Sequence, residues 1–222
     1  MLGKLIVFEG VDGSGKSTQF DMMCARFLSE NREFKKLNFP RYDQPSSALI
    51  KMYLGGEFGD KPDSVNAYAA SSFFAVDRYA SFAQDWREYY NDGGFILTDR
   101  YTTSNVLHQG AKIPVGERED FFKWLYEYEF DRIGLPKPDM VVYMDIDAEL
   151  ATKRLRMRES ETSTNADIHE KDLTYLANSV DSGKQAAVLF GWHSVKCVID
   201  DVERDKNDIH IAIYSNILNL LG

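Results

Sequence analysis

The 222-residue sequence has no long apolar run and only two cysteines, Cys24 and Cys197. A helix that crosses a membrane needs about 20 consecutive apolar residues, so we expect no transmembrane segment. The two cysteines form no C-x-x-C pair and predict no disulfide framework, which is compatible with a reducing compartment. The first residues run directly into an apolar, β-branched stretch, so we expect no signal peptide. These absences favour a cytoplasmic protein.

The sequence also lacks an excess of positive charge. It has 26 lysines and arginines against 35 acidic residues, a net charge of −9. General binders of nucleic acid or of anionic membranes carry basic surfaces, so we expect neither partner. An anionic substrate would have to be held by local arginines.

The order of patterns along the chain indicates its architecture. We find no internal repeat and no low-complexity linker, and the length fits one α/β domain over residues 1–222. Apolar runs predict strands at 4–9, 36–39, 95–98, 140–145 and 195–199. Helical periodicity predicts helices at 17–30, 47–53, 65–90, 117–130, 148–158, 170–190 and 208–221. This alternation is typical of a mostly parallel sheet with helices on both faces, in which ligands bind at the carboxyl ends of the strands.

The segment Gly10-Val11-Asp12-Gly13-Ser14-Gly15-Lys16-Ser17 matches the phosphate-binding P-loop pattern G-x-x-x-x-G-K-[ST]. Its glycines let backbone N–H groups surround phosphate oxygens, and the following helix adds a positive dipole. Lys16 can bridge the β- and γ-phosphates, and the Ser17 hydroxyl can bind Mg²⁺. Asp12 would repel donor phosphates, so we expect it to face a second substrate and accept from a sugar hydroxyl. The predicted ATP-binding residues are Gly10, Asp12, Gly13, Ser14, Gly15, Lys16, Ser17 and Thr18.

Two later strands are followed by residues suited to a phosphate site. Asp99 ends an apolar strand, a common place for a carboxylate that organises Mg²⁺ near a P-loop, and Arg100 can donate two N–H groups to a phosphate. Arg41 follows a proline that stiffens its turn, which suits a second phosphate contact. A surface ion pair at Asp99 and an exposed loop arginine at Arg41 are the alternatives.

Two helical segments carry candidates for recognition and catalysis. Phe74, Asp77 and Arg78 share a helix face, where Phe74 could stack on a base and Arg78 could donate to its exocyclic oxygen. A core phenylalanine beside a solvated ion pair is the alternative. Basic residues end the helix at 148–158, before a polar stretch that could be a mobile lid bringing an arginine to the phosphoryl group. Cations at a helix C-terminus are also favoured by the dipole alone.

Five segments in this order resemble the thymidylate kinase family: 8–18, 39–42, 74–78, 99–105 running on to 108–110, and 167–170. The resemblance implies ATP-dependent phosphorylation of dTMP to dTDP on a P-loop NTPase fold of the nucleoside monophosphate kinase type. That fold is a five-stranded parallel sheet flanked by helices, with a short mobile lid at approximately 154–170. It also implies ATP as co-substrate, Mg²⁺ as cofactor and a homodimer. Gly13 stands where many eukaryotic members carry arginine, which makes the chain resemble bacterial members.

The resemblance also implies roles for individual residues. Ser17 and Asp99 would organise Mg²⁺. The implied catalytic residues are Lys16, Arg100 and a lid arginine, which is Arg154, Arg156 or Arg158. The implied dTMP-binding residues are Asp12, Arg41, Tyr42, Phe74, Arg78, Arg100, Ser104, Asn105, His108, Gln109 and Glu170.

Two other functions fit parts of the pattern. A deoxynucleoside kinase shares the P-loop, but it needs a general base for a neutral hydroxyl and has no acceptor phosphate to hold. The pair of Arg41 and Arg100 therefore favours a monophosphate. A P-loop switch would leave the acceptor-site candidates without a use, and the sequence has no N-K-x-D guanine motif.

Overall fold

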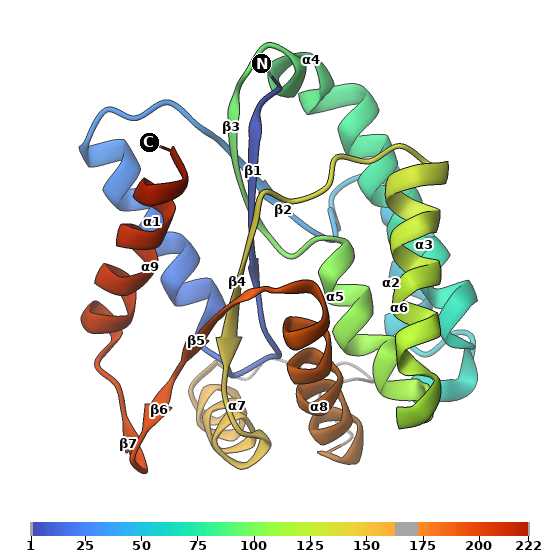
Figure 1. The fold of residues 1–222 in the computed structure, drawn as a ribbon. Coiled ribbons are helices and arrows are strands. Elements are labelled where there is room, and N and C mark those ends of the chain that lie inside the picture. The colour runs from blue at the N-terminus through green and yellow to red at the C-terminus, as the bar shows by residue number, and fades with distance from the viewer. Residues whose placement is uncertain (1, 163–172, 222) are drawn as a thin grey trace.

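Five parallel strands form the central sheet of the protein (Figure 1). The computed structural model describes residues 2–162 and 173–221, and the side chains of these residues except 158–162. The strand order is β2-β3-β1-β4-β5. The strands are β1 (Lys4–Glu9), β2 (Lys35–Asn38), β3 (Phe95–Asp99), β4 (Met140–Asp145) and β5 (His193–Lys196). The central strand β1 is buried from both faces, which explains its continuous apolar run.

The fifth strand differs from its prediction. Residues 195–199 were expected to form one strand, but β5 ends at Lys196. Val198–Ile199 (β6) pairs instead with Val202–Glu203 (β7) in an antiparallel hairpin. Asp200 and Asp201 form its turn with φ of 50° and 60°. Two successive positive φ values are the geometry of tight two-residue hairpins, and aspartate tolerates them. The turn chemistry therefore divides the apolar run.

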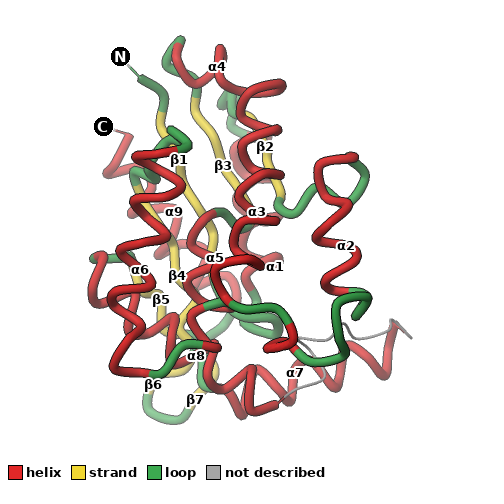
Figure 2. The backbone as a smooth tube through the Cα atoms, turned by 90° about the vertical axis from the view of Figure 1, so that its right-hand side faces the viewer, coloured by secondary structure: helices red, strands yellow, loops and turns green. Residues whose placement is uncertain are grey.

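Helices cover both faces of the sheet. They are α1 (Lys16–Ser29), α2 (Ala48–Leu54), α3 (Ala67–Ser81), α4 (Arg87–Asn91), α5 (Thr102–His108), α6 (Arg118–Tyr126), α7 (Ala148–Thr162), α8 (Leu173–Phe190) and α9 (Lys206–Leu221). Helices α1 and α9 lie on one face in Figure 1, and Figure 2 shows α3, α5 and α6 in front of the strands on the other. The layered α/β architecture is confirmed.

Two helical predictions need correction. The expected helix at 65–90 is three pieces, because a π-helical turn at Phe82–Trp86 separates α3 from α4. Helix α5 was not predicted, because its seven residues are too few for a clear period. It begins three residues after Asp99 and so carries its side chains to the carboxyl end of the sheet.

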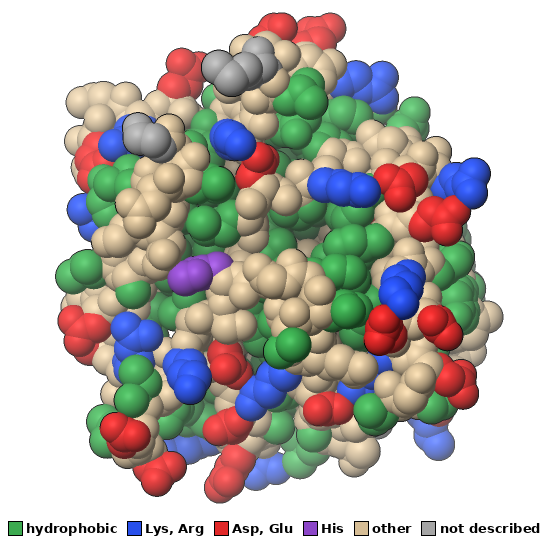
Figure 3. Space-filling view, viewed as in Figure 1, with side chains coloured by type: hydrophobic (Ala, Val, Ile, Leu, Met, Phe, Trp, Pro, Cys, Tyr) green, Lys and Arg blue, Asp and Glu red, His purple; other side chains and the backbone are tan. Residues whose placement is uncertain are grey.

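The surface charge and the character of the helices can be compared with the expectations of no basic surface and no transmembrane segment. On the face shown in Figure 3, basic and acidic side chains are interspersed. None of the helices that the structure describes combines the length and apolar content needed to cross a bilayer.

A partly buried lysine, Lys112, ties α2 to the segment that follows α5. The Nζ of Lys112 donates to the Tyr53 hydroxyl at 2.7 Å and to the Val65 carbonyl at 2.9 Å. The Tyr53 ring in turn packs edge-on against Phe74, with ring centroids 6.4 Å apart. Burial lowers the pKa of Lys112 to about 7. The lysine therefore acts as a structural tie whose charge is lost near neutral pH.

Lys112 should make stability depend on pH. Its pKa is about 7 in the folded chain and 10.5 ordinarily, so folding releases a proton between those values. The free energy of unfolding should therefore gain from this group as pH rises from 7, and the gain is absent below 7, where both states are protonated. Between pH 7 and pH 9, the free energy of unfolding measured in urea should rise by about 1–2 kcal/mol less in Lys112→Met than in the wild-type protein. Lys123→Met, at an exposed lysine, is the control, and wild-type behaviour of Lys112→Met would contradict the assignment.

Candidate active site

The P-loop lies between the end of β1 and the start of α1, as predicted. It encloses a cavity of about 280 Å³ lined by residues 11–18 and Arg154. Gly13 has φ of 81°, and a Cβ there would lie 2.4 Å from the Ala151 carbonyl oxygen, so α7 packs directly on the loop. Gly15 precedes α1 with φ of 87°. The glycine pattern therefore follows from backbone conformation and close packing.

Lys16 and Ser17 meet the end of β3 beneath this loop. Lys16 is buried and forms an ion pair with Asp99. The Ser17 hydroxyl lies 3.4 Å from the other oxygen of Asp99. Burial lowers the pKa of Lys16, as does the nearby Arg100, while Asp99 opposes the shift. The predicted phosphate lysine and the two predicted magnesium ligands are thus brought together.

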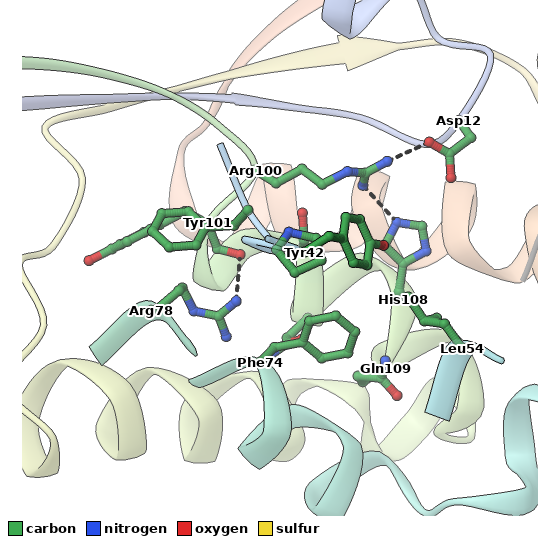
Figure 4. Close-up of a pocket in the computed structure, with 13 residues that line it drawn as sticks. Asp12, Tyr42, Leu54, Phe74, Arg78, Arg100, Tyr101, His108 and Gln109 are labelled. Atoms are coloured by element: carbon green, nitrogen blue, oxygen red, sulfur yellow. Dashed lines mark hydrogen bonds and ion pairs between the residues drawn. The ribbon is translucent and has the colours of Figure 1, made fainter. Parts of the chain in front are cut away.

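A second pocket of about 200 Å³ adjoins the P-loop at the carboxyl ends of β1 and β3 (Figure 4). Its lining contains nine of the predicted dTMP-binding residues: Asp12, Tyr42, Phe74, Arg78, Arg100, Ser104, Asn105, His108 and Gln109. Phe39, Pro40, Leu54 and Tyr101 complete the lining. Of the two other predicted residues, Arg41 does not line the pocket and Glu170 lies outside the described residues.

Arg100 occupies the P-loop end of this pocket. Its φ is 67°, an uncommon value for a residue with a side chain. One terminal nitrogen donates to Asp12, and the other lies 3.1 Å from His108 Nε2 (Figure 4). Burial and the charge of Arg100 lower the pKa of His108 to about 3, so the ring is neutral and Nε2 can accept. Burial opposes the charge on Arg100, but Asp12 and Glu9 outweigh it and raise its pKa.

Glu9 had no predicted role, yet it organises this end of the site. It is fully buried and accepts from the Gly10 N–H at 2.9 Å and from the Thr103 and Ser104 hydroxyls at 2.7 and 2.8 Å. Burial raises its pKa. The Ser104 hydroxyl therefore donates its hydrogen bond to Glu9 and not to a ligand in the pocket. An acid at the last position of a buried strand was the available sequence signal.

The far end of the pocket has an aromatic ring and amide and guanidinium groups. Phe74 and Arg78 line it from α3, and Asn105 and Gln109 line it from α5 and the residue after it. Arg78 is 2% exposed, so the alternative of a solvated Asp77–Arg78 pair is wrong. Gln109 is fully buried, and neither atom of its amide has a partner among the described residues. Such a pair of unused donor and acceptor suits the edge of a bound base.

Arg41 is held away from this pocket. Its Nε lies 3.4 Å from Asp77 and Nη2 lies 3.2 Å from the Ser46 hydroxyl, while Nη1 pairs with Asp85. Its backbone N–H also donates to Asp77 at 2.9 Å. The guanidinium group of Arg41 is therefore held by the carboxylates of Asp77 and Asp85. Of the two arginines predicted to hold phosphate, the structure brings only Arg100 to the pocket.

Comparison with known proteins places this geometry in a family. The family model for thymidylate kinase matches residues 8–202. The chain belongs to the thymidylate kinase family. It is 36% identical over 170 residues to the thymidylate kinase of Mycobacterium tuberculosis, covering 76% of this chain and 78% of that one. It is 30% identical over 153 residues to the thymidylate kinase of Homo sapiens, covering 68% and 65%.

A solved thymidylate kinase structure supports the fold. The enzyme from Candida albicans superposes with a TM-score of 0.72 over 98% of this chain and 92% of that chain, at 22% identity. The predicted five-stranded P-loop NTPase fold of the nucleoside monophosphate kinase type is therefore confirmed.

The thymidylate kinase resemblance left three candidate lid arginines, and the structure distinguishes two of them. Arg154 Nη1 lies 3.4 and 3.3 Å from the carbonyl oxygens of Gly13 and Ser14, and Nη2 lies 3.0 Å from Glu203 of β7. Arg156, two residues further along α7, is exposed, and it lines a groove beside the β6–β7 hairpin and not the P-loop cavity. The side chain of Arg158 lies outside the described set, as do residues 163–170 of the predicted lid.

Proposed function

We propose that residues 1–222 form one catalytic domain that transfers the γ-phosphoryl group of ATP to dTMP, giving ADP and dTDP, with Mg²⁺ as cofactor. Family membership supports the reaction. The observation that carries the residue assignment is the pairing of Arg100 with Asp12 at the junction of two cavities. The P-loop cavity is built for nucleotide phosphates, and the adjoining pocket has an arginine at one end and an aromatic ring with polar groups at the other.

The donor side fits a magnesium nucleotide. Mg²⁺ prefers oxygen ligands and keeps several waters, binding through one or two protein groups and substrate phosphates. The Ser17 hydroxyl and the Asp99 carboxylate, 3.4 Å apart, are such a donor set. Ser17 and Asp99 would hold the ion, whose positive charge would stabilise the negative charge of the phosphates during transfer. Lys16, now paired with Asp99, would then turn its charge to the phosphates of ATP.

The acceptor side fits dTMP. Arg100 would exchange part of its pairing with Asp12 for the substrate phosphate, and the released Asp12 could accept from the sugar 3′-hydroxyl. Neutral His108 keeps its acceptor nitrogen on Arg100, which fixes the guanidinium. Phe74 would stack on thymine. Arg78, Asn105 and Gln109 would meet its Watson–Crick edge.

The reaction then depends on positioning the two substrates and does not need a general base from the protein. A phosphate oxygen of dTMP, already ionised, attacks the γ-phosphorus, and the bond from that phosphorus to the β-phosphate oxygen breaks. ADP leaves with the electron pair, so no protein nucleophile takes part. Lys16 and Arg154 line the cavity where this charge moves and can stabilise it.

The test is ADP release from Mg-ATP with dTMP, dUMP, dCMP, dGMP, dAMP, UMP and thymidine as acceptors. We expect dTMP to give the highest kcat/KM. A response to thymidine alone would make the protein a nucleoside kinase. ATP binding with no response to any acceptor would favour a P-loop switch.

The resemblance to family members also predicts a homodimer, and one helix face supports it. Tyr68, Val76 and Tyr79 recur at helical spacing along α3 and are 45, 53 and 42% exposed. An exposed apolar stripe beside a binding pocket is typical of a protein interface. We expect sedimentation to show a dimer that Val76→Asp converts to monomer, and a monomeric wild-type protein would overturn this. The two free cysteines are buried, which fits a cytoplasmic enzyme.

A further inference from the structure

Glu129 lies behind the base end of the pocket and has no assigned role. It belongs to the π-helical segment Glu127–Arg132 that continues α6, and its side chain is fully buried. Its oxygens accept from Arg78 Nε at 2.7 Å and Nη2 at 2.5 Å, and from the Thr102 hydroxyl at 2.7 Å. The Asn105 amide nitrogen lies 3.3 Å away. Donors from α3 and α5 therefore converge on one carboxylate.

This carboxylate fixes which atoms of Arg78 and Asn105 can serve a ligand. With Nε and Nη2 of Arg78 committed to Glu129, the guanidinium plane is set, and Nη1 lies 3.4 Å from the Tyr101 carbonyl beside the pocket (Figure 4). The amide nitrogen of Asn105 also donates to the Ser71 carbonyl at 3.2 Å. Because both neighbours of that nitrogen are acceptors, the amide cannot turn around without losing both bonds. Asn105 is left with only its carbonyl oxygen to offer a base.

Gln109 contrasts with these two residues. Its buried amide has no partner on either atom among the described residues, so it can present its N–H or its carbonyl to a ligand. It can therefore adapt to a base edge but cannot by itself choose between two edges of opposite polarity.

We propose that Glu129 is a positioning residue that sets the polarity of base recognition through Arg78 and Asn105. This rests on the proposed placement of the base at that end of the pocket. Thymine and uracil offer an acceptor at O4 and a donor at N3, which match a fixed arginine N–H and a fixed amide oxygen. Cytosine offers an amino donor at C4 and an acceptor at N3, so both contacts become repulsive. Selection for a 4-keto pyrimidine thus originates in a carboxylate that does not touch the substrate.

The experiment compares Glu129→Gln with wild type for dTMP, dUMP and dCMP, by steady-state kinetics and by calorimetric binding. Glutamine puts an N–H₂ group among the donors and removes the charge that holds Arg78. We expect kcat/KM for dTMP and dUMP to fall together by about 10-fold or more through KM, as for loss of charged hydrogen bonds. The kcat/KM for dCMP should hold or rise, and KM for ATP should not change. Glu129→Asp, which keeps the charge, should restore part of the selectivity.

The matched control is Asp181→Asn. Asp181 pairs at 2.5 Å with Arg118, another arginine of 2% exposure, and neither residue lines the pocket. This variant should leave the ratio of dTMP to dCMP efficiency unchanged.

Several results would overturn the proposal. An equal fall for all three nucleotides, a fall in kcat alone, or an unchanged ratio would make Glu129 a structural residue only. If Glu129→Gln does not unfold cooperatively on heating, the same comparison of kcat/KM for dTMP, dUMP and dCMP is made with Glu129→Asp. The shorter aspartate side chain lies further from Arg78, so a smaller loss of selectivity is expected. Wild-type protein inactive on dTMP would instead refute the proposed function, so the two failures are distinct.

Discussion

Replacing Lys16 with alanine is expected to lower kcat by about 100- to 1,000-fold, the usual effect of removing one preorganised group that stabilises transition-state charge. Lys16 is the lysine of the P-loop, and it lines the cavity between the glycine backbone and Asp99. The KM for dTMP should change little, because the lysine is not among the residues of the second pocket. Coupled measurement of ADP release at saturating substrates tests this expectation.

The same substitution should also lower the thermal stability of the protein. Asp99 is 6% exposed and would lose its cation partner, and a buried carboxylate without a partner destabilises the fold. Thermal unfolding of Lys16→Ala should therefore begin at lower temperature, and added Mg²⁺ should recover part of the loss. Lys36→Ala, at an exposed lysine paired with Asp21, is the control and should match wild type in both assays. Near-normal turnover of Lys16→Ala would remove the lysine from the phosphate site.

The sequence predicted those parts of the site that depend on local pattern. The P-loop, Asp99 and Arg100 each follow directly from a strand end, and the end of a parallel strand is where a ligand binds. Phe74 and Arg78 were identified as sharing a helix face, which needs only the helical period. In each case the relevant information lies within a few residues of the side chain.

The parts that the sequence did not predict depend on contacts between distant segments. Arg41 was expected at the pocket, but Asp77 and Asp85 hold it, and nothing near position 41 identifies those partners. Glu129 pairs with Arg78 across the fold. Its position four residues after the buried Leu125 puts an acid on an apolar helix face, which signals a buried acid but does not identify its partner. These contacts depend on which distant side chains are buried together in the fold, and local sequence preferences do not determine that.

Arg154→Ala is expected to lower kcat by about 100-fold while KM for dTMP stays near its wild-type value. Arg154 reaches the phosphate-binding loop from α7, where Gly13 and Ser14 carbonyls and Glu203 fix its guanidinium. An arginine already fixed beside the phosphate-binding loop loses little freedom when it stabilises bound phosphates, which favours a contribution to kcat over one to binding. Steady-state kinetics with varied ATP and dTMP separates the two parameters.

The comparison that decides this assignment is Arg156→Ala. Arg156 is on the same helix, two residues away, and carries the same charge, but it is exposed and lies away from the P-loop cavity. We expect its removal to change kcat by less than about threefold, within the range of a surface charge. Arg154→Lys should recover only part of the activity, because a lysine keeps the charge but lacks the planar fork whose two terminal nitrogens reach the loop carbonyls and Glu203 separately. If Arg156→Ala were the slower enzyme, the assignment of Arg154 would be wrong, and α7 would have to move during the reaction to bring Arg156 to the phosphates.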